Sequence, residues 1–213
     1  MKIRILALVA LLFVAASRAQ SQTPALRARL DATTWKSVSA LLDSVRADGL
    51  PTQPLESKAL EGISKGADGA RIVAALQRLA GELRVARQQL GSASTVAELD
   101  AGASAIHSGI NPEELARLRA ARPRQPLTIP LGMLADLVAR GVPADSASSA
   151  ALALAQSSMR DEDFVAFRRN VERDIALGAP PAAATSVRVN ATTRAFTLDS
   201  KASPSNTSTN RKP

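Results

Sequence analysis

The stretch GLPTQPLESKALEGISKG, residues 49–66, holds one complete helical unit between two glycines. Pro54 suits the first turn of a helix, where a missing backbone N–H costs nothing. Leu55 and Ala59 are one helical turn apart and start an apolar face, whereas Lys58, Glu61 and Lys65 fall on the opposite face. Gly66 ends the pattern, because glycine readily adopts the positive φ of a helix terminus. The stretch therefore predicts a short amphipathic helix with a tight joint at each end.

The opening of this stretch, a glycine followed by an apolar residue and then by proline or a capping residue, recurs along the chain. It returns as GINP at Gly109, GVPAD at Gly141 and GAPP at Gly178. Between these joints apolar residues recur at helical steps, and the aromatic residues that strands favour are scarce. The sequence predicts an all-α fold, an array of short helices and helical hairpins joined by Gly-x-Pro corners. The irregular glycine spacing favours a compact array over a regular solenoid.

Proline divides the helical part of the chain into two halves. Three prolines fall within residues 123–130, and this density favours an extended, Pro-rich connector. The sequence thus predicts an N-terminal helical half at residues 20–122 and a C-terminal helical half at residues 131–186. Whether the halves form one domain or two is left open.

The N-terminus has the pattern of a signal peptide. Lys2 and Arg4 precede an apolar run at residues 5–16, and small residues then lead to a cleavage site after Ala19. The apolar run is too short to span a membrane as a helix, so we do not expect an integral membrane protein. We predict that residues 1–19 are a signal peptide and that the protein is exported, to the periplasm or outside the cell. Cysteine is absent, so disulfides contribute nothing to the fold.

The basic residues are concentrated at the ends of the chain. The formal net charge is +8, yet the excess lies in residues 1–19 and near the C-terminus, which leaves the part between nearly neutral. A folded nucleic-acid module carries its positive charge on the module itself, so we expect no specific nucleic-acid partner. Residues 187–213 lack helical periodicity, which predicts a disordered basic tail. We expect weak contact of this tail with anionic surfaces, and we expect deletion of residues 188–213 to leave the fold intact.

Residue types that usually carry chemistry are rare in this chain. His107 is the single histidine, cysteine is absent, and no phosphate loop, nucleophile elbow or dinucleotide motif occurs. We therefore predict no catalytic residue, no cofactor and no metal. His107 lies in the last turn of a predicted helix, where partial burial or capping explains it better than catalysis.

One segment is locally basic and offers a possible anion contact, to a phosphate or an anionic lipid. It contains four arginines: Arg117, Arg119, Arg122 and Arg124. The alternative is a solvated surface on which Glu113 and Glu114, one turn away, offset the positive charge.

Two blocks of the sequence resemble an uncharacterised family of bacterial exported helical proteins. The second block is VERDIALGAPP, residues 171–181. The first block consists of Pro54-Leu55, Lys58, Glu61-Gly62 and Lys65-Gly66. The resemblance implies bacterial export and an α-helical fold, and it brings no activity and no site residue.

Two classes of function remain open from the sequence. The first is an exported, non-catalytic interaction or scaffold protein of the bacterial cell envelope, whose partner is an unknown protein or envelope component. The alternative is an envelope-polymer hydrolase that uses a pair of carboxylates, which sequence spacing alone does not identify. A deep polar pocket with two close, perturbed carboxylates would favour the enzyme, and a shallow groove would favour binding.

Overall fold

A computed structural model describes residues 23–157 and 159–202, and in these residues the chain forms ten α-helices and no strand. The all-α prediction is therefore confirmed. The predicted signal peptide, residues 1–19, lies outside the described residues. The helices are α1 Thr23–Arg29, α2 Ala32–Ala47, α3 Gln53–Ser64, α4 Gly69–Leu90, α5 Val96–His107, α6 Pro112–Ala121, α7 Thr128–Ala139, α8 Ala144–Gln156, α9 Asp161–Ala176 and α10 Pro181–Ala202.

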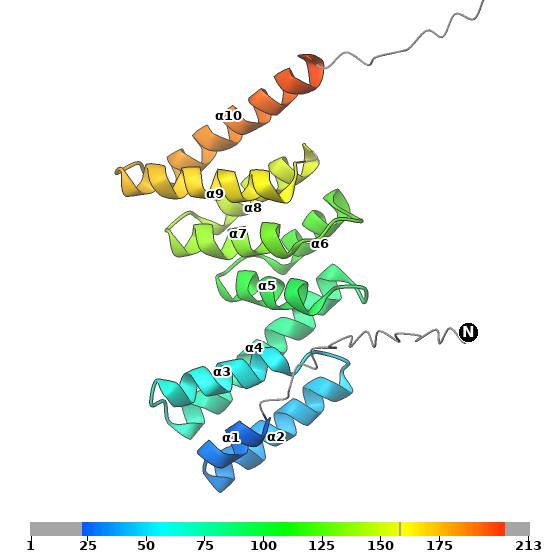
Figure 1. The fold of residues 1–213 in the computed structure, drawn as a ribbon, viewed down its shortest axis with the longest axis vertical. Coiled ribbons are helices and arrows are strands. Elements are labelled where there is room, and N and C mark those ends of the chain that lie inside the picture. The colour runs from blue at the N-terminus through cyan, green and yellow to red at the C-terminus, as the bar shows by residue number, and fades with distance from the viewer. Residues whose placement is uncertain (1–22, 158, 203–213) are drawn as a thin grey trace, which may run out of the picture.

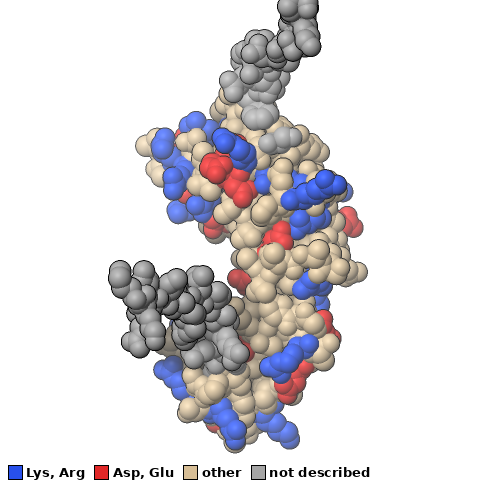
Figure 2. All heavy atoms as spheres, turned by 45° about the vertical axis from the view of Figure 1, so that its right-hand side comes forward, with Lys and Arg blue, Asp and Glu red and all other residues tan. Residues whose placement is uncertain are grey.

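The helices stack in two layers along one long axis. Odd-numbered helices form one layer and even-numbered helices the other, and neighbours within a layer pack against each other, with one exception described below (Figure 1). A single hydrophobic core runs through the stack from Leu26 to Ala184. The array is extended and curved rather than compact, and acidic and basic side chains are interspersed over the face shown in Figure 2. The two predicted halves share this core, since α5 packs against α7.

The glycine joints end helices as the sequence predicts. At Gly49 the backbone φ is +68°, and the N–H of Leu50 donates to the carbonyl of Val45 across 3.0 Å. This bond, which spans six residues, is the mark of a Schellman motif, and it folds Leu50 back into the core, where it is 6% exposed. The same bond pattern and a positive φ occur at Gly66, Gly109, Gly141 and Gly178.

Small residues allow the helices to approach each other closely. A Cβ at Gly102 of α5 would lie only 3.2 Å from the Cβ of Ala86 in α4 and 3.2 Å from Leu115 in α6. Ala80, Ala86 and Ala103 are fully buried in the same region. The alanine-rich composition therefore serves tight helix packing, as the sequence indicates.

Capping residues precede several of the helices. Asp31, Asp68, Thr95 and Asn111 each accept a backbone N–H in the first turn of the helix that follows. At α9 the arrangement differs, because Asp161 is the first residue of the helix. Arg160 occupies the cap position there, and its N–H donates to the Asp163 carboxylate across 2.9 Å.

Two predicted boundaries are wrong. The connector occupies residues 122–127 rather than 123–130, because α7 already begins at Thr128 and includes Pro130 in its first turn, where proline is tolerated. It is also not extended as predicted: it forms a turn in which the N–H of Gln125 donates to the carbonyl of Arg122. The predicted disorder does not start at residue 187, because α10 continues to Ala202. Packing against α8 and α9 stabilises this helix despite its weak periodicity. The rest of the predicted tail, residues 203–213, lies outside the described residues.

Candidate functional site

A groove opens where the regular stacking is interrupted. Among the described helices, α3 and α5 are the same-layer neighbours that do not pack closely, although both pack against α4. The space between them is about 850 Å³, with α3 and α5 as walls and α4 as floor, and Figure 1 shows the three helices around it. This volume lies within the range of ligand pockets, about 300–1,000 Å³.

Each helix turns one stripe of residues toward the groove. On each helix the lining residues are adjacent or lie three or four positions apart, so they share one face, while the opposite faces of α3, α4 and α5 fill the core. The lining residues are Gln53, Pro54, Ser57, Lys58 and Glu61 of α3, Ala75, Arg78, Leu79 and Glu82 of α4, and Val96, Ala97, Asp100, Ser104 and His107 of α5.

The charges on the α3 wall are paired with one another. Lys58 donates to one carboxylate oxygen of Glu61 across 2.9 Å, and Lys65 donates to the other across 2.5 Å. The hydrogen bond from Lys65, followed by that from Lys58, lowers the pKa of Glu61 to about 2. Glu61 is thus held ionised, which does not suit it to act as a general acid near neutral pH.

A second pair joins the floor of the groove to the α5 wall. Nδ1 of His107 lies 2.8 Å from Oε1 of Glu82, whose side chain is only 13% exposed, whereas that of His107 is 58% exposed. The His107 ring is partly covered, as the sequence allows, but its hydrogen bond reaches Glu82 of α4 rather than the end of its own helix. No described hydroxyl is hydrogen-bonded to the ring, so the pair orients the imidazole without forming a nucleophile–base arrangement.

Two charges in the groove have no ion pair with any described residue. Arg78 is exposed on the floor and Asp100 is exposed on the α5 wall. Next to them lies an apolar surface that includes Leu79, half-buried on the floor, and Val96, which is 48% exposed. The groove therefore presents one free cation, one free anion and an apolar contact area.

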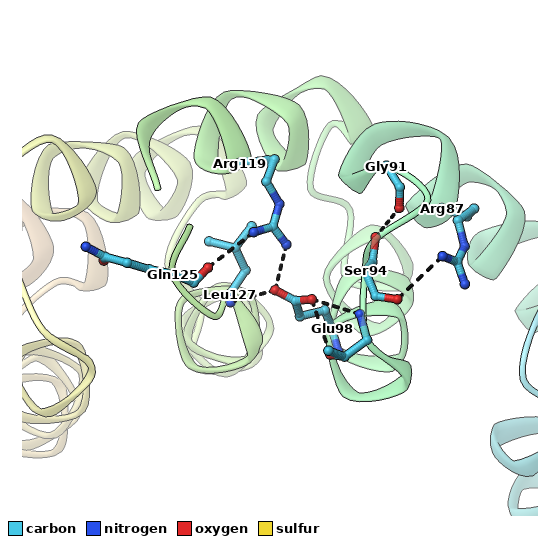
Figure 3. A network of polar contacts seen from close by, with 8 residues as sticks. Arg87, Gly91, Ser94, Glu98, Arg119, Gln125 and Leu127 are labelled. Carbon is cyan, nitrogen blue, oxygen red and sulfur yellow. Dashed lines mark hydrogen bonds and ion pairs between the residues drawn. The ribbon is translucent and has the colours of Figure 1, made fainter. Parts of the chain in front are cut away.

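The predicted arginine cluster does not form a shared anion site, because three of its four members pair with carboxylates of the chain itself. Arg119 donates to Glu98 across 2.6 Å and to the carbonyl of Gln125 across 3.2 Å (Figure 3). The other oxygen of Glu98 completes the capping box at Thr95. Glu98 is 4% exposed, and burial by itself would raise its pKa. The hydrogen bonds from Thr95, Arg119 and Leu127 outweigh burial and hold the pKa of Glu98 below its usual value.

Arg122 is also used internally. It is 3% exposed, donates to the Asp161 carboxylate across 2.7 Å and to the carbonyl of Met159 across 2.8 Å, and its guanidinium lies over the ring of Phe164. It ties the segment after α6 to the start of α9. Of the remaining two arginines, Arg117 pairs with Glu114 and Arg124 is exposed, so an anion contact stays a prediction for those two alone.

Sequence reasoning missed the groove. On α4 the small residue Ala80 is fully buried, whereas the larger apolar residue Leu79 lines the groove. The sequence does contain one signal for it: Ala75 and Leu79 lie beside Arg78 and Glu82 on one face of α4. A face that only contacts water does not require such apolar residues among its charges.

Comparisons with known proteins place this chain in no family: no family model, curated protein or solved structure matches it. Within residues 23–157 and 159–202, no helix is both long enough and apolar enough to cross a bilayer. The same residues contain no group of three or more His, Asp or Glu side chains that could hold a metal ion.

Proposed function

We propose that the protein is an exported, non-catalytic interaction protein of the bacterial cell envelope, and that it binds a partner protein in the groove between α3 and α5. The observation that carries the proposal is the break in the stacking at this point, a groove of about 850 Å³. Its lining combines an apolar surface with the unpaired charges of Arg78 and Asp100, the combination by which protein surfaces recognise partners.

The groove fits binding better than the alternative of an envelope-polymer hydrolase. Such a hydrolase needs one carboxyl group whose pKa is raised, so that it remains protonated near neutral pH. Glu61 has a strongly lowered pKa instead, and Glu82 is hydrogen-bonded to His107. The hydrolase has no observation of its own in its favour.

The export of the protein, which is part of the proposal, is inferred from the sequence of residues 1–19. The basic start, the apolar run and the small residues before Ala19 support a signal peptide that is cleaved near that residue. Sequencing of the secreted form should give an N-terminus near Gln20. A secreted form that begins at Met1 would remove the argument for a cleaved signal peptide.

Affinity capture with a blocked groove tests the binding site. The full chain is immobilised and exposed to envelope extract of the source organism, with Ala97→Trp as the blocking variant. Ala97 lies on the groove wall and is exposed, so the larger side chain fills the groove without entering the core. Ala166→Trp, the same change at an exposed position of α9, is the matched control.

We expect a protein that the unchanged chain and Ala166→Trp retain equally, and that Ala97→Trp retains about tenfold less, the effect of losing roughly 1.4 kcal/mol of binding free energy. Circular dichroism should show the same helix content for all three chains. Equal retention by Ala97→Trp and Ala166→Trp would contradict the proposed site.

A further inference from the structure

The groove between α3 and α5 also indicates what kind of segment fills it. We propose that the partner segment is an amphipathic α-helix that lies between α3 and α5, with an acidic residue facing Arg78 and a basic residue facing Asp100. This inference rests on the proposed function, because it names the class of partner for the same groove.

The walls of the groove favour a helix over an extended peptide. A bound extended peptide usually pairs its backbone N–H and C=O groups with an exposed sheet edge, or, if it is rich in proline, docks in an aromatic-lined groove. The described residues that line this groove include no Phe, Tyr or Trp side chain. Here the walls and the floor are helices, whose backbone groups are already bonded along each helix, so they offer no such edge. A helix satisfies its own backbone groups and presents only side chains to α3, α4 and α5.

The architecture supplies a place for that helix. All other same-layer neighbours among the described helices pack directly, and only α3 and α5 are separated while sharing the floor α4. A helix bound there gains contacts with α3 and α5 and packs against the mixed stripe of α4. Its apolar residues, spaced by three and four, would cover Leu79 and Val96, the apolar side chains that the groove leaves in contact with water.

Charge complementarity sets the polar pattern of the bound helix. Lys58 already pairs with Glu61, and His107 already pairs with Glu82, so these side chains do not need a partner from outside. Arg78 and Asp100 lack an ion pair with any described residue, and covering them would remove water from two charges of opposite sign. Such burial is unfavourable unless each charge meets its opposite, so the bound helix must carry one acid and one base.

The test uses a library of peptides that are stapled into helices and whose surface residues are randomised. Peptides that bind the full chain are selected from it. We expect the selected peptides to be amphipathic and to carry both an acid and a base. Arg78→Glu should weaken their binding about tenfold, and exchange of the peptide acid for lysine should restore it. Arg169→Glu, an equal charge reversal at an exposed position of α9, should leave their affinity unchanged.

A matched library of unstapled, proline-containing peptides separates this inference from the proposed function. If only these extended peptides bind, and Ala97→Trp blocks them, the groove is a binding site but the helix inference is wrong. If stapled peptides bind but charge reversal at Arg78 has no effect, the charge pattern is wrong. If Ala97→Trp affects no selected peptide, or if neither library yields a binder, the inference and the proposed function both fail.

Discussion

Arg119 of α6 donates a hydrogen bond to the carboxylate of Glu98 in α5 across 2.6 Å, and the same carboxylate oxygen accepts the N–H of Leu127 across 2.9 Å. One buried acid therefore joins α5, α6 and the segment that leads into α7. Because α5 is also a wall of the groove, this network fixes the position of that wall (Figure 3).

Replacement of the buried acid should destabilise the fold. Glu98→Gln removes the negative charge beside Arg119, whose guanidinium is mostly buried, and leaves that cation without its partner. We expect the free energy of unfolding to fall by about 2–3 kcal/mol in urea titrations. The control is Glu114→Gln, which removes the more exposed pair with Arg117 and should cost less than about 1 kcal/mol. Equal costs would show that the Glu98 network is not a main support of the α5 wall.

Glu98 should also make the free energy of unfolding depend on pH. The pKa of Glu98 is lower in the folded chain than in the unfolded chain, so its contribution to stability is present above the unfolded pKa of about 4.3 and is lost as pH falls through the folded value. The unchanged protein should therefore lose more stability between pH 6 and about pH 3 than Glu98→Gln does. Urea titrations at both pH values measure this difference. A larger loss in the variant would contradict the lowered pKa.

Replacement of two glycines by alanine should change the free energy of unfolding in opposite directions. Gly49 has a φ of +68° and open space around its Cα, so Gly49→Ala is strained only through its backbone and should cost about 1–2 kcal/mol. Gly81 lies within α4 with an ordinary helical φ and equally open space, so Gly81→Ala should stabilise the protein by about 0.5–1 kcal/mol. Thermal unfolding of the two variants checks both values. A stabilising Gly49→Ala would show that this joint is not a Schellman motif.

Deletion of residues 188–213 should lower the melting temperature, contrary to the expectation from sequence. Arg188 donates two hydrogen bonds to Asp174, at 2.6 and 2.7 Å, and Val189 packs against the core. The deletion also cuts through α10, which covers α8 and α9. Calorimetry of the shortened chain is the measurement, with Arg188→Ala as a smaller change in the same direction. An unchanged melting temperature would mean that α10 beyond residue 187 does not support the stack.

Local features of the fold could be predicted from sequence, because each depends on a few neighbouring residues. Each of these features involves residues of a single turn, as in the capping box of Thr95 and Glu98 and in the glycine joints at Gly49 and Gly141. These joints predict an array of short helices, but not its extended and curved shape. The length of α10 does not follow from them either, because its stability comes from packing against α8 and α9 rather than from its own periodicity.

The mixed stripe of α4 does not by itself predict the groove, because the groove also depends on the lack of close packing between α3 and α5. The capping role of Glu98 is local, but its pair with Arg119 needs the packing of α5 against α6 to be known. The sequence accordingly predicts Arg119 as a possible contact for an outside anion, whereas the anion is in the same chain. Arg78 and Asp100 carry no local mark that separates them from ordinary surface charges.

Site-directed photo-crosslinking can show whether the partner binds between α3 and α5. A photoreactive side chain is placed at Ser57 on the α3 wall, at Ser104 on the α5 wall and, as a control, at Ala166 on α9. We expect the two groove positions to yield an adduct with the same partner protein and Ala166 to yield none. Equal yields of adduct from Ala166 and from the two groove positions would contradict binding between α3 and α5. Adducts from Ala166 alone would contradict it as well.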